Sequence, residues 1–114
     1  MKRAEIEDAN VVDVTDACKA VEYPLDDADI NAVAIKINGR YPNKGRTVNK
    51  VCKELVYVLS GTGQVAVEGE VINLKKGSVV LIEPGERFYW EGNSLEMFMP
   101  CTPAWYPEQH KRVG

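Results

Sequence analysis

The chain has 114 residues, which suffices for one domain with a single core and leaves no room for a second domain. Its hydrophobic fraction of 45% and charged fraction of 27% are those of an ordinary globular protein, which argues against a disordered or a membrane chain. Lys and Arg number 14 against 17 Asp and Glu, and the resulting net charge of -3 makes nucleic acid an unfavourable partner.

The N-terminal segment carries no targeting signal. Residues Met1–Asp8 are mostly polar, and no apolar segment follows them. The chain also lacks a run of about 18 apolar residues that could span a membrane. Three widely spaced cysteines, Cys18, Cys52 and Cys101, are an odd number without a C-x-x-C motif, so a disulfide framework is not expected. These features predict a cytoplasmic protein.

Residues 1–29 are predicted to form an N-terminal arm that can contribute a strand, and residues 30–114 the main body of the domain. Within the arm, Asp13–Glu22 could form one or two helical turns before Pro24 ends them. This is the only part of the chain where a helix competes with extended structure.

After residue 30 the chain alternates between turns and short strands. Glycine, proline and asparagine recur at short intervals, including a predicted turn at 60–63. Segments rich in β-branched and aromatic residues lie between them at Ile30–Ile37, Glu54–Leu59, Gln64–Val67, Val79–Ile82, Phe88–Trp90 and Leu95–Cys101. A hairpin is expected from 65–67 to 71–74. No helical crossover of about a dozen residues fits between the strands, so the pattern predicts an all-β sandwich or barrel.

The predicted strand at 50–59 places one acidic residue among apolar ones. Successive side chains of a strand point to opposite faces, so Glu54 shares a face with Cys52 and two valines. Two leucines and a tyrosine share the other face, which suggests that a second sheet or a subunit covers it. Glu54 either stays hydrated at the open end of a barrel or faces a cavity.

Two segments resemble the motifs of the cupin superfamily. Residues 54–61 (ELVYVLSG) are similar to the end of the first motif, where six residues separate a Glu from a Gly. Residues 77–88 (GSVVLIEPGERF) are similar to the second motif, in which a His follows three residues after the last Gly, although Pro84 stands one place later than in that motif. The Pro- and Trp-containing end at 102–107 also resembles that of small single-domain, RmlC-like cupins.

The resemblance implies an all-β cupin double-stranded β-helix, a jelly-roll-like barrel, over roughly residues 30–110. It also implies a homodimer, because cupins commonly pair through strand exchange or sheet packing. Trp105, Tyr106 and Pro107 lie beyond the last expected strand. These large residues are expected to cover the outer face of the barrel, its mouth or a partner subunit.

The resemblance also indicates that the metal motif is degenerate. A metal-binding cupin has two histidines separated by one residue before the Glu, and a third in the second motif. Aligned on Glu54, the pair falls at Val48 and Lys50, or at Thr47 and Asn49 if the spacing is one residue longer, and a phenylalanine takes the third place. One carboxylate cannot hold a divalent ion against water. No metal and no other cofactor is therefore expected.

We predict instead a metal-independent pocket that binds a small molecule and is lined by Lys50, Glu54, Phe88 and Trp90. Phe88 and Trp90 share one strand face, and their rings suit stacking on a sugar or a planar ligand. A sugar or a small organic acid is the expected ligand. The alternatives are that the two rings fill the core and that Glu54 forms a salt bridge with Lys50 or Arg46. No catalytic residue is predicted.

Two other functions remain open. A metal-dependent cupin enzyme, such as an isomerase, an epimerase or a dioxygenase-like protein, would need an atypical zinc or iron site built from Cys52, Glu54 and His110. Otherwise His110, the only histidine, is expected to be solvated in the C-terminal tail. A structural or assembly protein would have a solid barrel and bind its partner on the outer faces.

Overall fold

The computed structural model describes residues 1–114 and consists almost entirely of β-structure. Nine strands join in one sheet, accompanied by two 3-10 turns and no α-helix, so the all-β prediction is confirmed. No helical segment is long and apolar enough to cross a membrane. The elements are η1 (Ile6–Asp8), β1 (Asn10–Thr15), β2 (Cys18–Glu22), β3 (Asn31–Tyr41), β4 (Arg46–Asn49), β5 (Lys53–Val67), β6 (Glu70–Leu74), β7 (Val79–Ile82), β8 (Arg87–Thr102), η2 (Pro107–Gln109) and β9 (His110–Val113).

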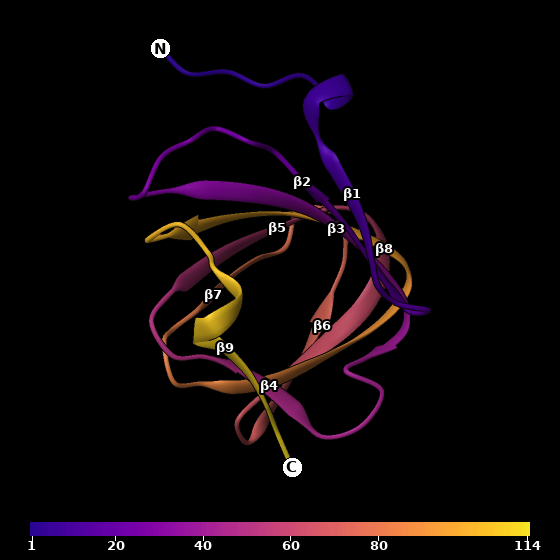
Figure 1. Ribbon diagram of the computed structural model, residues 1–114. Helices are drawn as coiled ribbons and strands as arrows, with labels where there is room; N and C mark the ends of the chain where they lie inside the picture. The colour runs from indigo at the N-terminus through magenta and orange to yellow at the C-terminus, as the bar shows by residue number, and fades with distance from the viewer.

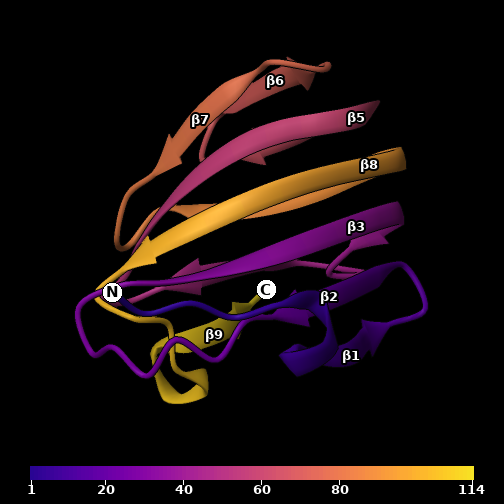
Figure 2. The same ribbon diagram turned by 90° about the horizontal axis from the view of Figure 1, so that it is seen from above.

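The sheet curls into a jelly-roll-like barrel (Figure 1). Its strand order is β1-β2-β3-β8-β4-β9, and β5 also pairs with β8 and carries β6 and β7. All of these pairings are antiparallel. Figure 2 shows β5, β8 and β3 side by side as the longest strands of the wall. The C-terminal strand β9 pairs with β4, which brings the end of the chain back to the barrel.

The N-terminal arm forms a hairpin where a short helix was considered. Strand β1 pairs with β2, and β2 pairs in turn with β3, with Cys18 opposite Ile37. The helical alternative for residues 13–22 is therefore wrong. Val11, Val12 and Val14 are β-branched and favour extended backbone. In addition, β2 gains a ladder of backbone hydrogen bonds along β3 that an isolated helix would lack.

Two pairs of predicted strands are each one long strand. Residues 54–59 and 64–67 both belong to β5, and 88–90 and 95–101 both belong to β8. The pairing of β5 with β8 is irregular around Ser60 and Thr62. Gly61 there has φ of +79°, and a Cβ on it would lie 2.0 Å from the carbonyl oxygen of Ser94. The predicted turn is thus an irregularity that lets a continuous strand bend.

The core lies inside the barrel and follows the predicted alternation. On β5, Glu54 and the valines at 56 and 58 are buried, whereas Leu55, Tyr57 and Leu59 on the outer face are each 45% exposed. The hairpin of β5 and β6 also forms in the expected place, with Ala66 opposite Val71. The inner face of the sheet therefore supplies both the core and the walls of a cavity.

Candidate functional site

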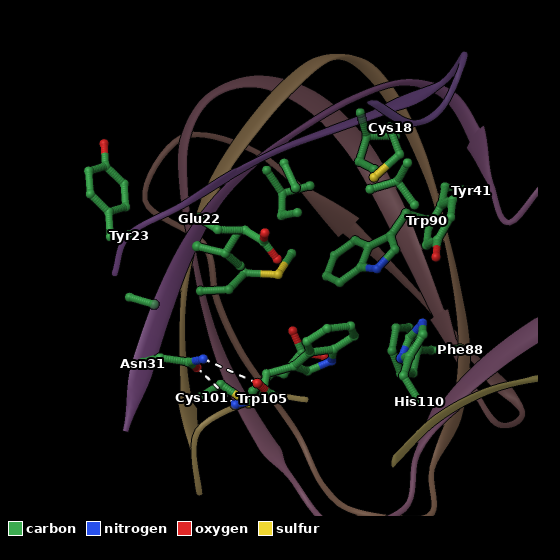
Figure 3. A pocket seen from close by; sticks show the side chains of 18 residues that line it. Cys18, Glu22, Tyr23, Asn31, Tyr41, Phe88, Trp90, Cys101, Trp105 and His110 are labelled. Atoms are coloured by element: carbon green, nitrogen blue, oxygen red, sulfur yellow. Dashed lines mark hydrogen bonds between the residues drawn. The ribbon is translucent and has the colours of Figure 1, made fainter. Parts of the chain in front are cut away.

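The barrel contains a cavity of about 260 Å³ on its concave face (Figure 3). Of its 18 lining residues, 14 are hydrophobic, and none is a lysine or an arginine. The lining residues come from β1, β2, β3, β5 and β8, together with Trp105 and His110 of the C-terminal segment. The volume lies just below the roughly 300–1,000 Å³ range of small-molecule sites. A solid barrel, the third function considered from the sequence, does not match this interior.

Aromatic rings line the cavity, among them Tyr41, Phe88, Trp90 and Trp105. Phe88 and Trp90 lie two residues apart on β8 and point inward together, as predicted from their spacing. Their ring centroids are 6.1 Å apart and the planes are inclined by 78°, an edge-to-face arrangement. Figure 3 shows Tyr41, Trp90, Phe88 and His110 grouped on one side of the cavity.

Trp105 is held over the cavity by Asn31 at the start of β3. The backbone N–H of Trp105 donates to Asn31 Oδ1 at 3.0 Å, and Asn31 Nδ2 donates to the Trp105 carbonyl at 3.3 Å. The backbone N–H of Ala104 also donates to the carbonyl of Ala28. Of the three locations expected for residues 105–107, Trp105 takes the mouth of the barrel, whereas Tyr106 is 40% exposed.

Glu54 is buried at the end of the cavity without a cationic partner. Its side chain accepts a hydrogen bond from Asn49 Nδ2 and forms no salt bridge. Burial raises the pKa of Glu54, and the hydrogen bond from Asn49 opposes that rise. The ion pair considered as an alternative does not form, because Lys50 is exposed and Arg46 instead donates to backbone carbonyls.

A chain of buried amides fixes the orientation of the neighbouring side chains. Gln109 Oε1 accepts from the backbone N–H groups of Val51 and Cys52, each at 3.2 Å. Its Nε2 therefore donates to Asn49 Oδ1 at 3.0 Å. That oxygen also lies 2.8 Å from His110 Nδ1. Since an amide oxygen can only accept, Nδ1 carries the hydrogen and donates it.

The same bonds place a neutral imidazole at the cavity. Burial lowers the pKa of His110, and the charge of Arg112 lowers it further. With its hydrogen on Nδ1, the ring keeps a lone pair on Nε2. The ring lines the cavity, and its centroid lies 5.6 Å from that of Trp105. The expectation that His110 is solvated was wrong, because pairing of β9 with β4 places Asn49 opposite His110.

Three of the four residues predicted to line the pocket do so. Glu54, Phe88 and Trp90 border the cavity, whereas Lys50 lies outside it and is exposed. The reason is the direction of the chain at the end of β4: Asn49 is fully buried and faces Glu54. The next residue therefore points outward.

The side chains at the family's ligand positions do not fit a metal. Thr47 and Asn49 are both fully buried, whereas Lys50 of the alternative pair is exposed, and Phe88 occupies the third place. The Thr47 hydroxyl donates to the Phe88 carbonyl, and the NH2 of Asn49 donates to Oε1 of Glu54, so neither residue offers a free ligand atom to a cation. Such a set offers one carboxylate and no imidazole pair.

The three residues considered for an atypical zinc or iron site are also not arranged to bind a metal ion. No group of three or more His, Cys, Asp or Glu side chains in the structure could hold a metal ion, so Cys52, Glu54 and His110 do not converge. Glu54 and His110 do border one cavity, but Asn49 lies between them and bonds to both. Cys52 is buried outside the cavity lining.

Several site residues were not identified from the sequence. Asn49 appeared only as an alternative position of the metal motif, although alternation along β4 could have favoured it. Nothing local marks Gln109 or His110, because their place depends on β9 returning to β4. Tyr41 ends a strand that continues four residues beyond the predicted Ile37.

The comparison with protein families decides the classification. A family model described as "Cupin domain" matches residues 43–99, half of the chain. The chain is a cupin. The resemblance found in its two motifs is thereby confirmed. No curated protein matches the sequence.

Solved structures share the fold of this cupin at low sequence identity. The Streptomyces protein Pac13, described as a nucleoside dehydratase, is 18% identical, with a TM-score of 0.87 over 99% of this chain and 91% of its own. The polyketide cyclase RemF from Streptomyces resistomycificus is 16% identical, with a TM-score of 0.75 over 100% and 86%. KdgF from Halomonas sp. is 16% identical, with a TM-score of 0.73 over 90% and 94%. These neighbours have diverse activities and establish the fold alone.

Proposed function

We propose that this cupin binds a small, uncharged, ring-bearing molecule in its cavity and needs no metal to do so. One observation carries the proposal: aromatic rings wall a cavity that ends on a buried carboxyl and has no lysine or arginine in its lining. Aromatic walls hold a ring through its faces and edges, and a few polar groups at one end set its orientation.

The absence of positive charge favours a neutral ligand over an organic acid. A carboxylate that enters an apolar cavity loses its hydration and needs a cation or several hydrogen-bond donors in return. Lys50, the one cation predicted to line the pocket, is exposed and lies outside the cavity. Glu54 would instead repel an anion whenever it is ionised. Of the two ligand classes expected from the sequence, sugars and related uncharged ring compounds therefore fit better.

Both tryptophans of the chain line the cavity, so their fluorescence reports directly on its contents. We expect uridine, the ligand named for structures of Pac13, and methyl glucoside to change the emission saturably. Benzoate should have a much smaller effect at equal concentration. A protein whose emission responds to benzoate but to neither neutral compound would contradict the proposal.

A matched pair of variants separates cavity binding from nonspecific quenching. Phe88→Ala removes an inner wall, and we expect it to weaken the response at least several-fold. Lys76→Ala changes an exposed residue in the turn after β6, and its titration should match that of the parent protein. Equal loss of response in both variants would count against the cavity as the binding site.

We also propose a cytoplasmic location and a homodimer. The three cysteines are unpaired and buried, as is usual for proteins of a reducing compartment. The exposed apolar residues on the outer face of β5 support pairing with a second copy, since monomers rarely leave large apolar patches in water.

A further inference from the structure

The polar end of the cavity presents two atoms that have no partner within the protein. His110 uses Nδ1 in its bond to Asn49, and its Nε2 forms no hydrogen bond. Every sealed side-chain nitrogen or oxygen in the structure has a partner, so Nε2 must be accessible. Because the ring borders the cavity, this accessible atom is available to a bound molecule. It is an acceptor, since the hydrogen is held on Nδ1.

The second free atom belongs to Glu54. Asn49 Nδ2 donates to Oε1, and Oε2 forms no hydrogen bond although the residue is only 9% exposed. By the same reasoning Oε2 is not fully sealed, and Glu54 is one of the residues that line the cavity. No lysine, arginine or protonated imidazole faces the carboxyl, and apolar walls surround it. Burial here raises the pKa of Glu54, which favours the neutral acid, whose O–H is a donor.

We propose that His110 and Glu54 form a two-point site that accepts one hydrogen bond and donates another, and that the ligand is a cyclic compound with an N–H or O–H next to a carbonyl. His110 Nε2 receives the hydrogen, and the Glu54 hydroxyl donates to the carbonyl oxygen. Asn49 is the positioning residue, because its single amide bonds to both partners and holds them at the same end of the cavity. Lactams and cyclic hydroxyketones carry this pair of groups.

This inference rests on the proposed function, since it requires that the cavity bind a small ring. It adds an expectation about which polar groups the ring must bear. A compound that lacks one of the two groups displaces the water bound to the corresponding protein atom but gives that atom no hydrogen bond in return. Such a loss weakens binding roughly 10-fold or more.

Three soluble six-membered rings test the two points separately. 2-Piperidone has both the N–H and the carbonyl, N-methyl-2-piperidone lacks the N–H, and cyclohexanone has only the carbonyl. We expect 2-piperidone to bind about 10-fold more tightly than either analogue, as measured by chemical-shift titration of the 15N-labelled protein. This readout tolerates the weak affinity of such small molecules.

Variants identify the protein partner of each group. His110→Phe should weaken the binding of 2-piperidone about 10-fold. It should leave the affinity for N-methyl-2-piperidone unchanged, because that analogue has no N–H to donate. Glu54→Gln keeps a hydrogen-bond donor, so its affinity for 2-piperidone should stay within about threefold of that of the parent protein. Glu54→Met has no donor and should bind 2-piperidone about 10-fold more weakly. Lys76→Ala is the matched surface control and should change none of the three affinities.

The tautomer can be observed without any ligand, because His110 is the only histidine. Long-range 1H–15N spectra should show a pyrrole-like Nδ1 and a pyridine-like Nε2, and Asn49→Ala should abolish this preference. A hydrogen on Nε2 in the parent protein would overturn the proposal.

The outcomes also separate the two proposals. Equal affinity for the three rings, or binding of uridine without binding of 2-piperidone, would overturn the two-point site and leave the cavity's general function intact. If uridine, methyl glucoside and the three rings all fail to bind, both proposals are wrong.

Discussion

Asn49 links two side chains that the sequence places far apart. Its Nδ2 donates to Glu54 on β5, and its Oδ1 accepts from Gln109 and from His110 at the start of β9. Asn49 and Gln109 are almost completely buried, so these bonds replace the water that burial removed. A single amide therefore fixes both the carboxyl and the imidazole at the end of the cavity.

Replacement of Asn49 should be costly for this reason. Asn49→Ala leaves the Glu54 carboxyl, the Nε2 of Gln109 and the Nδ1 of His110 each without a partner. We expect the free energy of unfolding to fall by about 2–4 kcal/mol, measured by urea denaturation. Lys50→Ala, one position along the chain but exposed, should change it by less than about 0.5 kcal/mol. Similar values for both variants would mean that the amide network adds little to stability.

The raised pKa of Glu54 predicts a pH-dependent stability. The folded protein retains a proton that the unfolded chain releases above its ordinary pKa of 4.5. Over that window the unfolded state binds fewer protons, so the free energy of unfolding falls as pH rises from 4.5 through the raised pKa. Relative to Glu54→Gln, which cannot ionise, the parent protein should lose stability across this range.

Comparison of the two proteins cancels the contribution of His110, which has the opposite sign. Its lowered pKa means that the unfolded chain binds more protons just below pH 6.5, so this contribution increases stability with rising pH. Urea denaturation at several pH values measures the difference between the parent protein and Glu54→Gln. A pH-independent difference would show that Glu54 ionises equally in both states.

At the scale of the strands, the bend in β5 depends on a glycine. A side chain at Gly61 would meet the Ser94 carbonyl oxygen, and its φ of +79° disfavours other residues. We expect Gly61→Ala to lower the free energy of unfolding by more than about 2 kcal/mol. Gly69→Ala is the matched control, since no atom lies within 4 Å of a Cβ there. If thermal or urea denaturation shows the same loss of stability for Gly61→Ala and Gly69→Ala, the close approach of Gly61 to Ser94 does not explain the requirement for glycine.

The elements that the sequence predicted correctly have local causes. The hairpin of β5 and β6 and the inward pair Phe88 and Trp90 follow from turn residues and from alternation, which act over a few positions. The continuity of β5 and β8 was missed, because a glycine in a turn and a glycine in a bent strand have the same local sequence. Only the long-range pairing of β5 with β8 distinguishes them.

In the candidate site, too, local sequence predicted some side-chain positions, and long-range strand pairing determined the others. Glu54 could be predicted to point inward from its neighbours on β5. His110 could not, because Asn49, its hydrogen-bond partner, lies 61 residues away and the strand that carries it begins at the histidine itself. Lys50 was misplaced by one position, and in a strand that difference moves a side chain to the opposite face.

On the scale of the whole molecule, the outer face of β5, β7 and β8 is apolar and uncovered. Leu55 pairs across the strands with Leu81, and Tyr57 with Val79 and Phe98; all five are 37–60% exposed and none is charged. These five uncharged side chains can pack against the same five of a second copy without bringing unpaired charges together.

We therefore predict a homodimer through this face, detectable by light scattering coupled to size-exclusion chromatography. Leu81→Lys places a charge in the centre of the face and should give a monomer with an intact cavity. Lys76→Ala, outside the face, should leave the dimer unchanged. A monomeric parent protein, or a dimer that persists in Leu81→Lys, would show that the face is not the interface.

The central claim is that a cavity without a fitting metal site binds an uncharged ring. The most direct test is a uridine titration followed by tryptophan fluorescence, before and after exhaustive removal of metal ions with a chelator. The account predicts the same affinity in both preparations and no further change when zinc or iron is added back. Binding that disappears with the metal and returns when zinc or iron is restored would contradict it.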